Sequence, residues 1–110
     1  MSDNLTQDRR LELHKILTDV LGSNNVYFQP PESLKIKYPA IIYHQNGGKT
    51  RFSNNEPYVV RRRYTLTFIT NNPDDDVIRR IAYEPRIPGI TYDRHYTKDG
   101  LNYEVYSLFY

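Results

Sequence analysis

The chain has 110 residues, the length of one domain, with 15 Lys and Arg against 13 Asp and Glu. The resulting net charge of +2 is too balanced to imply a polyanionic partner, and the absence of cysteine excludes disulfides, thiolate nucleophiles and cysteine-bound metals. No apolar run approaches the roughly 18 residues of a transmembrane helix and the N-terminus is unlike a signal peptide, so we expect a soluble cytoplasmic protein without a membrane partner.

The first predicted element is a helix in TQDRRLELHKILTDVLG, residues 6–22. Its apolar residues recur with the spacing of one helical face: they are Leu13, Ile16, Leu17, Val20 and Leu21. Thr6 is a suitable N-cap, and Gly22 is suited to a left-handed C-terminal cap. His14 lies next to the apolar face, and we interpret it as a border residue rather than as a ligand.

Extended chain follows this helix. Two consecutive prolines after residue 29 disfavour helix, so we expect a short extended piece at residues 26–29 and then a loop. The run YPAIIYHQ, residues 38–45, predicts a strand. The letters NGGK that come next are typical of a turn, and we therefore expect residues 46–57 to form a long polar loop.

Three consecutive arginines stand at the head of a second predicted strand, in NNEPYVVRRRYTLTFIT, residues 54–70. Neighbouring side chains of a strand point to opposite faces. The row expected to face the core contains Tyr64, Leu66 and Phe68. Arg61 and Arg63 then belong to the opposite face, toward solvent or a partner, whereas Arg62 shares the inner row and can extend outward near the strand end. The three arginines therefore do not form one basic patch.

A second helix is predicted in NNPDDDVIRRIAYEP, residues 71–85. Asn72 is a suitable N-cap, Pro73 fits the first helical position, and the three following aspartates fit the first turn. We prefer this explanation of the acidic run to a metal site, because consecutive aspartates on a helix point to different faces. The apolar face consists of Val77, Ile78, Ile81 and Ala82.

The C-terminal segment ITYDRHYTKDGLNYEVYSLFY reads as a β-hairpin. Lys98, Asp99 and Gly100 supply its turn, with Gly100 suited to a positive φ. Because the returning strand continues to the last residue, we expect the C-terminus to be held in the sheet.

These elements predict a single α+β domain over residues 1–110. We expect a four-stranded, mostly antiparallel sheet with both helices packed on one face, plus the long polar loop. Eleven tyrosines without any tryptophan fit a thin domain that completes its burial in an assembly, although tyrosine-rich sheets also occur in monomers.

Catalytic chemistry finds little support in the sequence. The three histidines, His14, His44 and His95, have no metal-ligand spacing. Asp93 and His95 are expected to share a strand face, but no nucleophile elbow accompanies them, and NGGK lacks the frame of a phosphate-binding loop. We therefore expect no enzyme activity, no cofactor and no bound metal.

One basic stretch remains, formed by Lys49, Arg51 and the arginine strand. It could line a channel through which DNA passes, or it could keep an edge strand soluble. We favour the second explanation on the residues alone.

Four segments in this order resemble the tail completion, or tail terminator, proteins of long-tailed (siphovirus-like) double-stranded DNA bacteriophages. They are VYFQPPESLKIKYPAIIY, then F-x-N-N-x-x-Y, then YTLTFITNNPDDDVIRRIAYEP and finally YDRHYTKDGLNYEVYSLFY. The similarity extends from about residue 11 to residue 110, and it depends on order and length rather than on a catalytic signature.

The resemblance implies a structural protein of the virion that forms a homohexameric ring. Such a ring caps the tail tube at the head-tail junction and joins the tail to the head connector, after assembly in the host cytoplasm. Its implied partners are further copies of the chain, the tail tube protein, the connector or head-closure protein, and DNA in transit. The alternatives are a head-closure or neck protein, and a small nucleic-acid-binding protein.

We expect the interface or channel to involve residues of the polar loop and of the arginine strand. These are Lys49, Arg51, Phe52, Asn54, Asn55, Tyr58, Arg61 and Arg63. Arg61 and Arg63 are expected to contact carboxylates of a neighbouring subunit or, transiently, DNA. The loop from Gly47 to Pro57 is expected to become ordered only against the tube or a neighbour.

Overall fold

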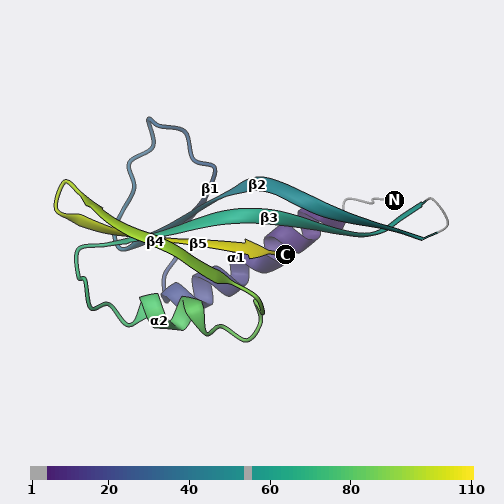
Figure 1. The fold of residues 1–110 in the computed structure, drawn as a ribbon. Helices are drawn as coiled ribbons and strands as arrows, with labels where there is room; N and C mark the ends of the chain where they lie inside the picture. Colours follow the sequence, from purple (N-terminus) through teal and green to yellow (C-terminus); the bar gives the residue numbers. More distant parts are fainter. Residues whose placement is uncertain (1–4, 54–55) are drawn as a thin grey trace.

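The computed structural model describes residues 5–53 and 56–110, and the side chains of residues 7–47 and 61–110. Figure 1 shows two helices and five strands in the described chain. In chain order they are α1 (Leu5–Leu21), β1 (Val26–Phe28), β2 (Ala40–Ser53), β3 (Glu56–Thr70), α2 (Val77–Ala82), β4 (Thr91–Lys98) and β5 (Leu101–Phe109).

The strands form one mixed sheet in the order β1-β2-β3-β5-β4. β1 runs parallel to β2, with Val26 opposite Ile41, and the other neighbours are antiparallel. The predicted α+β class is confirmed, but the prediction of four strands is wrong. Sequence analysis identified residues 26–29 only as extended chain, because three residues carry too little pattern to indicate a pairing with a strand that begins 14 residues later.

The long polar loop is also absent from the described chain, because β2 continues to Ser53 and β3 begins at Glu56. The Asn46-Gly47-Gly48 signal marks an irregularity in the pairing of these strands between Gln45 and Gly48, where Gly47 adopts φ +106°. Glycine permits that positive φ without a Cβ clash. The residues that are typical of a turn therefore form a bulge within a strand at this position. The predicted loop is therefore strand at residues 47–53 and 56–57, and Asn54 and Asn55 lie outside the described residues. That this segment becomes ordered only against the tube or a neighbour stays a prediction.

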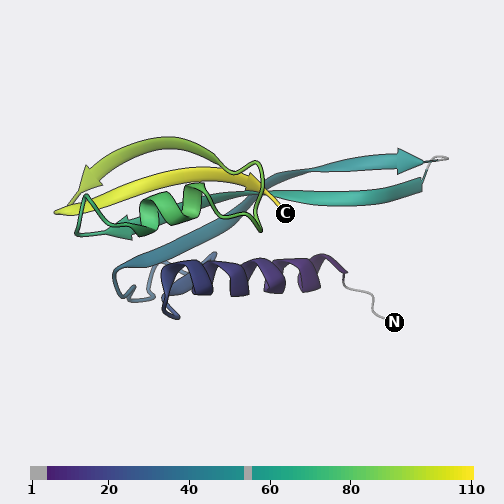
Figure 2. The same cartoon turned by 90° about the horizontal axis from the view of Figure 1, so that it is seen from below.

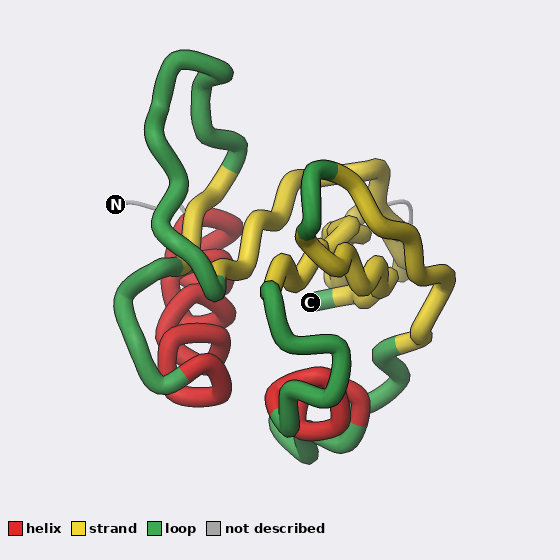
Figure 3. Tube along the Cα trace, turned by 90° about the vertical axis from the view of Figure 1, so that its left-hand side faces the viewer, coloured by secondary structure: helices red, strands yellow, loops and turns green. Residues whose placement is uncertain are grey.

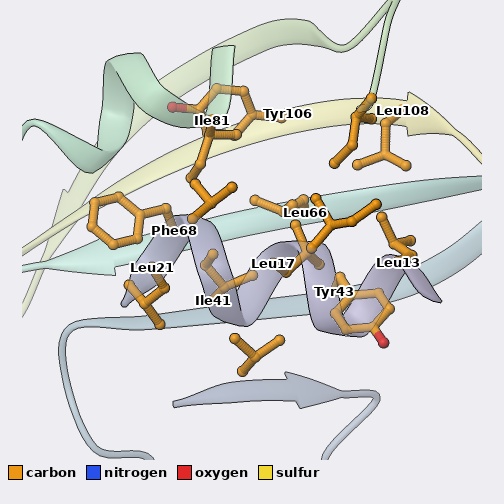
Figure 4. Packing of buried hydrophobic residues seen from close by; sticks show 14 of the residues in the cluster. Leu13, Leu17, Leu21, Ile41, Tyr43, Leu66, Phe68, Ile81, Tyr106 and Leu108 are labelled. Atoms are coloured by element: carbon orange, nitrogen blue, oxygen red, sulfur yellow. The ribbon is translucent and has the colours of Figure 1, made fainter. Parts of the chain in front are cut away.

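Helix α1 supplies five of the sixteen buried residues in the described core cluster. Its predicted apolar residues are all buried: Leu13, Ile16, Leu17, Val20 and Leu21. Figure 4 shows Leu13, Leu17 and Leu21 of this face packed with Ile41, Tyr43 and Leu66 of the sheet. Gly22 ends the helix at φ +82°, as predicted, and its N–H donates to the Thr18 carbonyl. The helix already includes Leu5, so Thr6 lies in its first turn and the prediction of Thr6 as N-cap is wrong.

Helix α2 is shorter than predicted, because the acidic run forms a turn before it. Asn72 Oδ1 accepts from Asp74 N–H, and Asp75 Oδ1 accepts from Val77 N–H. The residue at the N-cap position is Asp76, so the prediction of Asn72 as the N-cap is wrong. Short polar side chains compete with the helix for backbone donors, which explains the delayed start. Val77 and Ile81 are buried, as the predicted apolar face requires.

The C-terminal hairpin is confirmed. Asp99 and Gly100 have φ of +52° and +77°, and they join β4 to β5. β5 lies between β3 and β4, and Tyr110 N–H still donates to the Arg62 carbonyl beyond the end of the strand. The chain end is therefore fastened into the middle of the sheet.

Both helices contribute to one hydrophobic cluster on the same face of the sheet, as predicted. Tyr106 of β5 lies on this face and donates its hydroxyl hydrogen to the Ile78 carbonyl of α2 at 2.8 Å. Figure 3 shows the two helices, with the loop between β1 and β2 projecting away from α2. In the described part of the chain, no helix has the length and apolar character needed to cross a membrane.

Candidate interaction surfaces

The strands β2 and β3 extend beyond the rest of the sheet. β5 pairs with β3 only from Arg63 to Thr70, and Tyr110 N–H adds one hydrogen bond to the Arg62 carbonyl. Apart from that bond, the segments Gly48–Ser53 and Glu56–Arg62 pair only with each other among the described residues. We call these two segments the arm. Figure 2 shows the arm projecting past the C-terminus as a two-stranded ribbon, and it gives the molecule its extents of 52 × 27 × 22 Å.

Most of the residues predicted for an interface belong to the arm. The register places Lys49 opposite Arg61, Arg51 opposite Val59 and Phe52 opposite Pro57. Tyr58 lies in β3. The structure does not describe the side chains of Lys49, Arg51, Phe52 and Tyr58. Asn54 and Asn55 lie outside the described residues. The structure thus places Lys49 and Arg61 opposite each other in neighbouring strands. The sequence had predicted a loop at Lys49 and a strand at Arg61.

The arginine side chains alternate as predicted. Arg61 and Arg63 are exposed, and Arg62 is half-buried. The same alternation continues into the core, where Tyr64, Leu66 and Phe68 are buried. Arg63 lies opposite Phe109 of β5, on the face of the sheet that the helices do not cover.

We call this surface the helix-free face. By strand alternation and register it carries Arg61, Arg63, Thr65 and Thr67 of β3, Tyr103, Ser107 and Phe109 of β5, and Arg94, Tyr96 and Lys98 of β4. The rings of Tyr96 and Tyr103 stack with centroids 4.7 Å apart and planes 7° from parallel. The Arg94 guanidinium lies 5.9 Å from the centroid of the Tyr96 ring. All eight residues of β4 are exposed.

The stacked tyrosine pair was not predicted, although the hairpin sequence contained the signal. A two-residue turn at 99–100 places Lys98 opposite Leu101 and, two residues further, Tyr96 opposite Tyr103. Counting outward from the turn would have identified the pair.

The Asp93–His95 prediction is wrong. An irregularity in the register between Tyr92 and Arg94 moves Asp93 out of the alternation, and its carboxylate accepts from the Ser107 hydroxyl at 2.6 Å on the helix-free face. His95 lies on the other face, where its Nδ1 is 2.6 Å from Glu104 Oε2. A bulge inserts one extra residue into the strand, so the side chains before it point to the opposite face from the one that simple alternation predicts.

Glu104 is an unforeseen buried carboxylate at the centre of β5, only 4% exposed. Besides His95, it accepts a hydrogen bond from the Tyr92 hydroxyl at 2.7 Å. This hydrogen bond, with burial second, raises the pKa of Tyr92 to about 12. Both carboxylate oxygens thus have partners, and no described buried polar side-chain atom lacks one. The arrangement stabilises a buried charge and presents no nucleophile.

His14 is a border residue, as interpreted from the sequence. It is half-buried on α1, and its Nδ1 lies 2.8 Å from the Tyr43 hydroxyl. Burial, and then the charge of Arg10, lower the pKa of His14 below its ordinary value. Within the described residues, no group of three or more histidines and carboxylates is placed to hold a metal ion.

Comparison of the sequence with protein-family models gave no match, and neither did a search of curated proteins. The function must therefore be argued from the surfaces described above and from the resemblance of the sequence segments.

Proposed function

We propose that this chain is a structural protein of a bacteriophage virion that assembles as a homohexameric ring, caps the tail tube and joins the tail to the head connector. The segment resemblance suggests this role. The observation that supports it best is the arm, because its two strands project from the sheet without a third strand among the described residues.

An isolated two-stranded hairpin is at best marginally stable in water, and independent stability normally requires a third strand or a packed helix. The arm has neither among the described residues beyond Arg63, where its pairing with β5 ends. Contact with another protein would supply the missing burial. In a closed ring each subunit offers a different surface to each of its two neighbours, and an arm at one end of an elongated molecule suits such a head-to-tail contact.

The arm also carries most of the interface residues expected from the sequence, including the opposed pair Lys49 and Arg61. In the ring, Arg61 and Arg63 face the next subunit or the rim of the channel, where they contact carboxylates or, transiently, DNA. Charge-assisted hydrogen bonds of this kind fix the register between subunits.

The test is the mass of the protein in solution by light scattering, alone and after addition of the cognate tail tube protein. We expect a hexamer, either free or induced by the tube. A protein that stays monomeric under both conditions would contradict the ring and favour a head-closure or neck protein.

A shortened variant tests whether the arm makes the contact. Residues 50–60 are replaced by Asn-Gly, a two-residue hairpin turn that joins the register partners Lys49 and Arg61. The expected result is a folded protein that no longer forms the ring. A matched control with Tyr83→Ser, which removes an aromatic side chain 78% exposed on the helical side, should assemble normally.

A further inference from the structure

The described cations differ in their ion pairs, and those that pair with no described residue include Arg9, Arg10 and Lys15 of α1 as well as a set on the helix-free face. On the helical side, Arg79 and Arg80 both pair with Asp76, and Arg86 pairs with Asp19 and Glu84. On the helix-free face, none of Arg61, Arg63, Arg94 and Lys98 forms an ion pair with any described residue. Although the net charge of the whole chain is only +2, the helix-free face therefore carries basic side chains without ion-pair partners among the described residues.

Carboxylates offset this charge only in part, through Asp93 of β4 and through Asp99 in the hairpin turn next to Lys98. Among the strand residues whose side chains are described, Asp93 is the one carboxylate on the helix-free face, and its acceptor capacity is partly used by Ser107. Glu104 points to the opposite face, where Tyr92 and His95 satisfy it. The basic surface is thus available to an anion from outside the chain.

The cations form a spaced row. Arg63, Arg94 and Lys98 lie level with Phe109, Val105 and Leu101 of β5, respectively. Each step covers four residues of that strand, about 13 Å at 3.3 Å per residue. Charges distributed in this way match a long polyanion better than a small anion, which would require the cations to converge on one point.

Aromatic rings lie within the same row. The Tyr96–Tyr103 stack is placed between Arg94 and Lys98 in the hairpin, and Tyr96 remains 40% exposed with Arg94 beside its ring. Exposed aromatic faces interleaved with cations are how sheets bind unpaired bases, since every base offers a π-face. An acidic protein surface would also be attracted by the cations, but an exposed ring flanked by cations is best matched by a flat base with a phosphate on either side.

We infer that the helix-free face binds nucleic acid, with the phosphates on Arg61, Arg63, Arg94 and Lys98 and an unpaired base on Tyr96. This inference goes beyond the proposed ring and does not depend on it, because every group belongs to a single chain.

Binding is measured by fluorescence anisotropy with a labelled single strand of about 20 nucleotides, longer than the site of a small sheet domain, and with the same sequence as a duplex. With four phosphate contacts, the slope of log K against log salt for the single strand should be about −3, at −0.7 per phosphate. The duplex should bind by its phosphates alone and more weakly.

The matched variants remove equal charge from opposite faces. Arg63→Ala with Arg94→Ala should weaken binding by about tenfold and flatten the salt slope by about 1.4, the share of two phosphates. Arg79→Ala with Arg80→Ala should leave affinity within about twofold. Tyr96→Ala should weaken binding of the single strand and leave the duplex unchanged. All five residues are exposed, and thermal unfolding verifies that each variant is folded.

Three results would overturn the inference: no binding at about 50 mM salt, equal losses in the two arginine pairs, or displacement of DNA by polyglutamate at matched charge. The last would identify an acidic protein as the partner of this face. None of them bears on the mass measurement that tests the ring, so the two proposals can fail separately.

Discussion

Glu104 shows how this small domain accommodates a charge in its interior. Desolvating a carboxylate is costly unless donors replace its water. Tyr92 and His95, both on the edge strand β4, provide those donors at 2.7 and 2.6 Å. The exposed edge strand is thus fastened to β5 by side chains as well as by its backbone ladder.

The coupling between Tyr92 and Glu104 predicts a dependence of stability on alkaline pH. The pKa of Tyr92 is raised from 10.0 to about 12 in the folded protein. Between these values the unfolded chain releases a proton that the folded chain keeps, so this contribution to stability is complete below pH 10 and is lost as pH rises toward 12. Tyr92→Phe should reduce the number of protons released on unfolding by about one in this range, as measured by urea denaturation at several pH values.

Glu104→Gln is the companion variant, because it removes the carboxylate whose hydrogen bond and, to a lesser extent, whose charge raise the pKa of Tyr92. It should flatten the alkaline pH dependence in the same direction. The wild type will still lose stability at high pH, since burial raises the pKa of Tyr106 and Tyr103 as well. A pH dependence identical in Tyr92→Phe and wild type would contradict the role of this hydrogen bond.

Helix α1 illustrates how one element combines a buried and an exposed leucine. Leu17 is 1% exposed in the core cluster, whereas Leu11 is 46% exposed on the other side of the same helix. The two residues have the same intrinsic helix propensity, so the comparison isolates burial.

Leu17→Ala should lower the free energy of unfolding by about 2–5 kcal/mol, because it removes apolar contacts and leaves a cavity. Leu11→Ala should change it by less than about 0.5 kcal/mol. Chemical denaturation of both variants measures the difference. Similar values for the two would mean that α1 does not pack as the structure shows.

The core and the projecting part of the whole molecule lie at unusual positions along the chain. The extreme C-terminus lies in a central strand and contributes Tyr106 and Leu108 to the core, whereas the middle of the chain forms the projecting arm. A deletion at the C-terminal end should therefore destabilise the fold more than a deletion in the middle of the chain, although chain ends usually tolerate change better.

Removal of residues 106–110 should prevent folding, because it deletes core side chains and breaks the pairing of β3 with β5. Replacement of residues 50–60 by Asn-Gly, a larger change, should retain the cooperative unfolding transition. Circular dichroism during thermal unfolding of the two proteins tests this contrast. A shortened arm that abolishes the transition would show that the arm is part of the folding unit.

Local patterns determined the helices, the C-terminal turn and the facing of β3. Each depends on neighbours within a few residues: the 3.6-residue spacing of Leu13 to Leu21, the positive φ at Gly100, and the alternation around Arg62. The same local arithmetic could have identified the Tyr96–Tyr103 pair.

Tertiary structure decided what depends on distant segments. A pairing partner turned residues 26–28 into a strand and converted the glycine-rich segment after Gln45 from a turn into a bulge in a long hairpin. Strand order decided which arginines are left without carboxylates, because charge balance on a surface is a property of its neighbours in space. The sequence by itself therefore determined the elements and their buried faces, through short-range sterics and burial, while only the fold created the arm and the basic helix-free face.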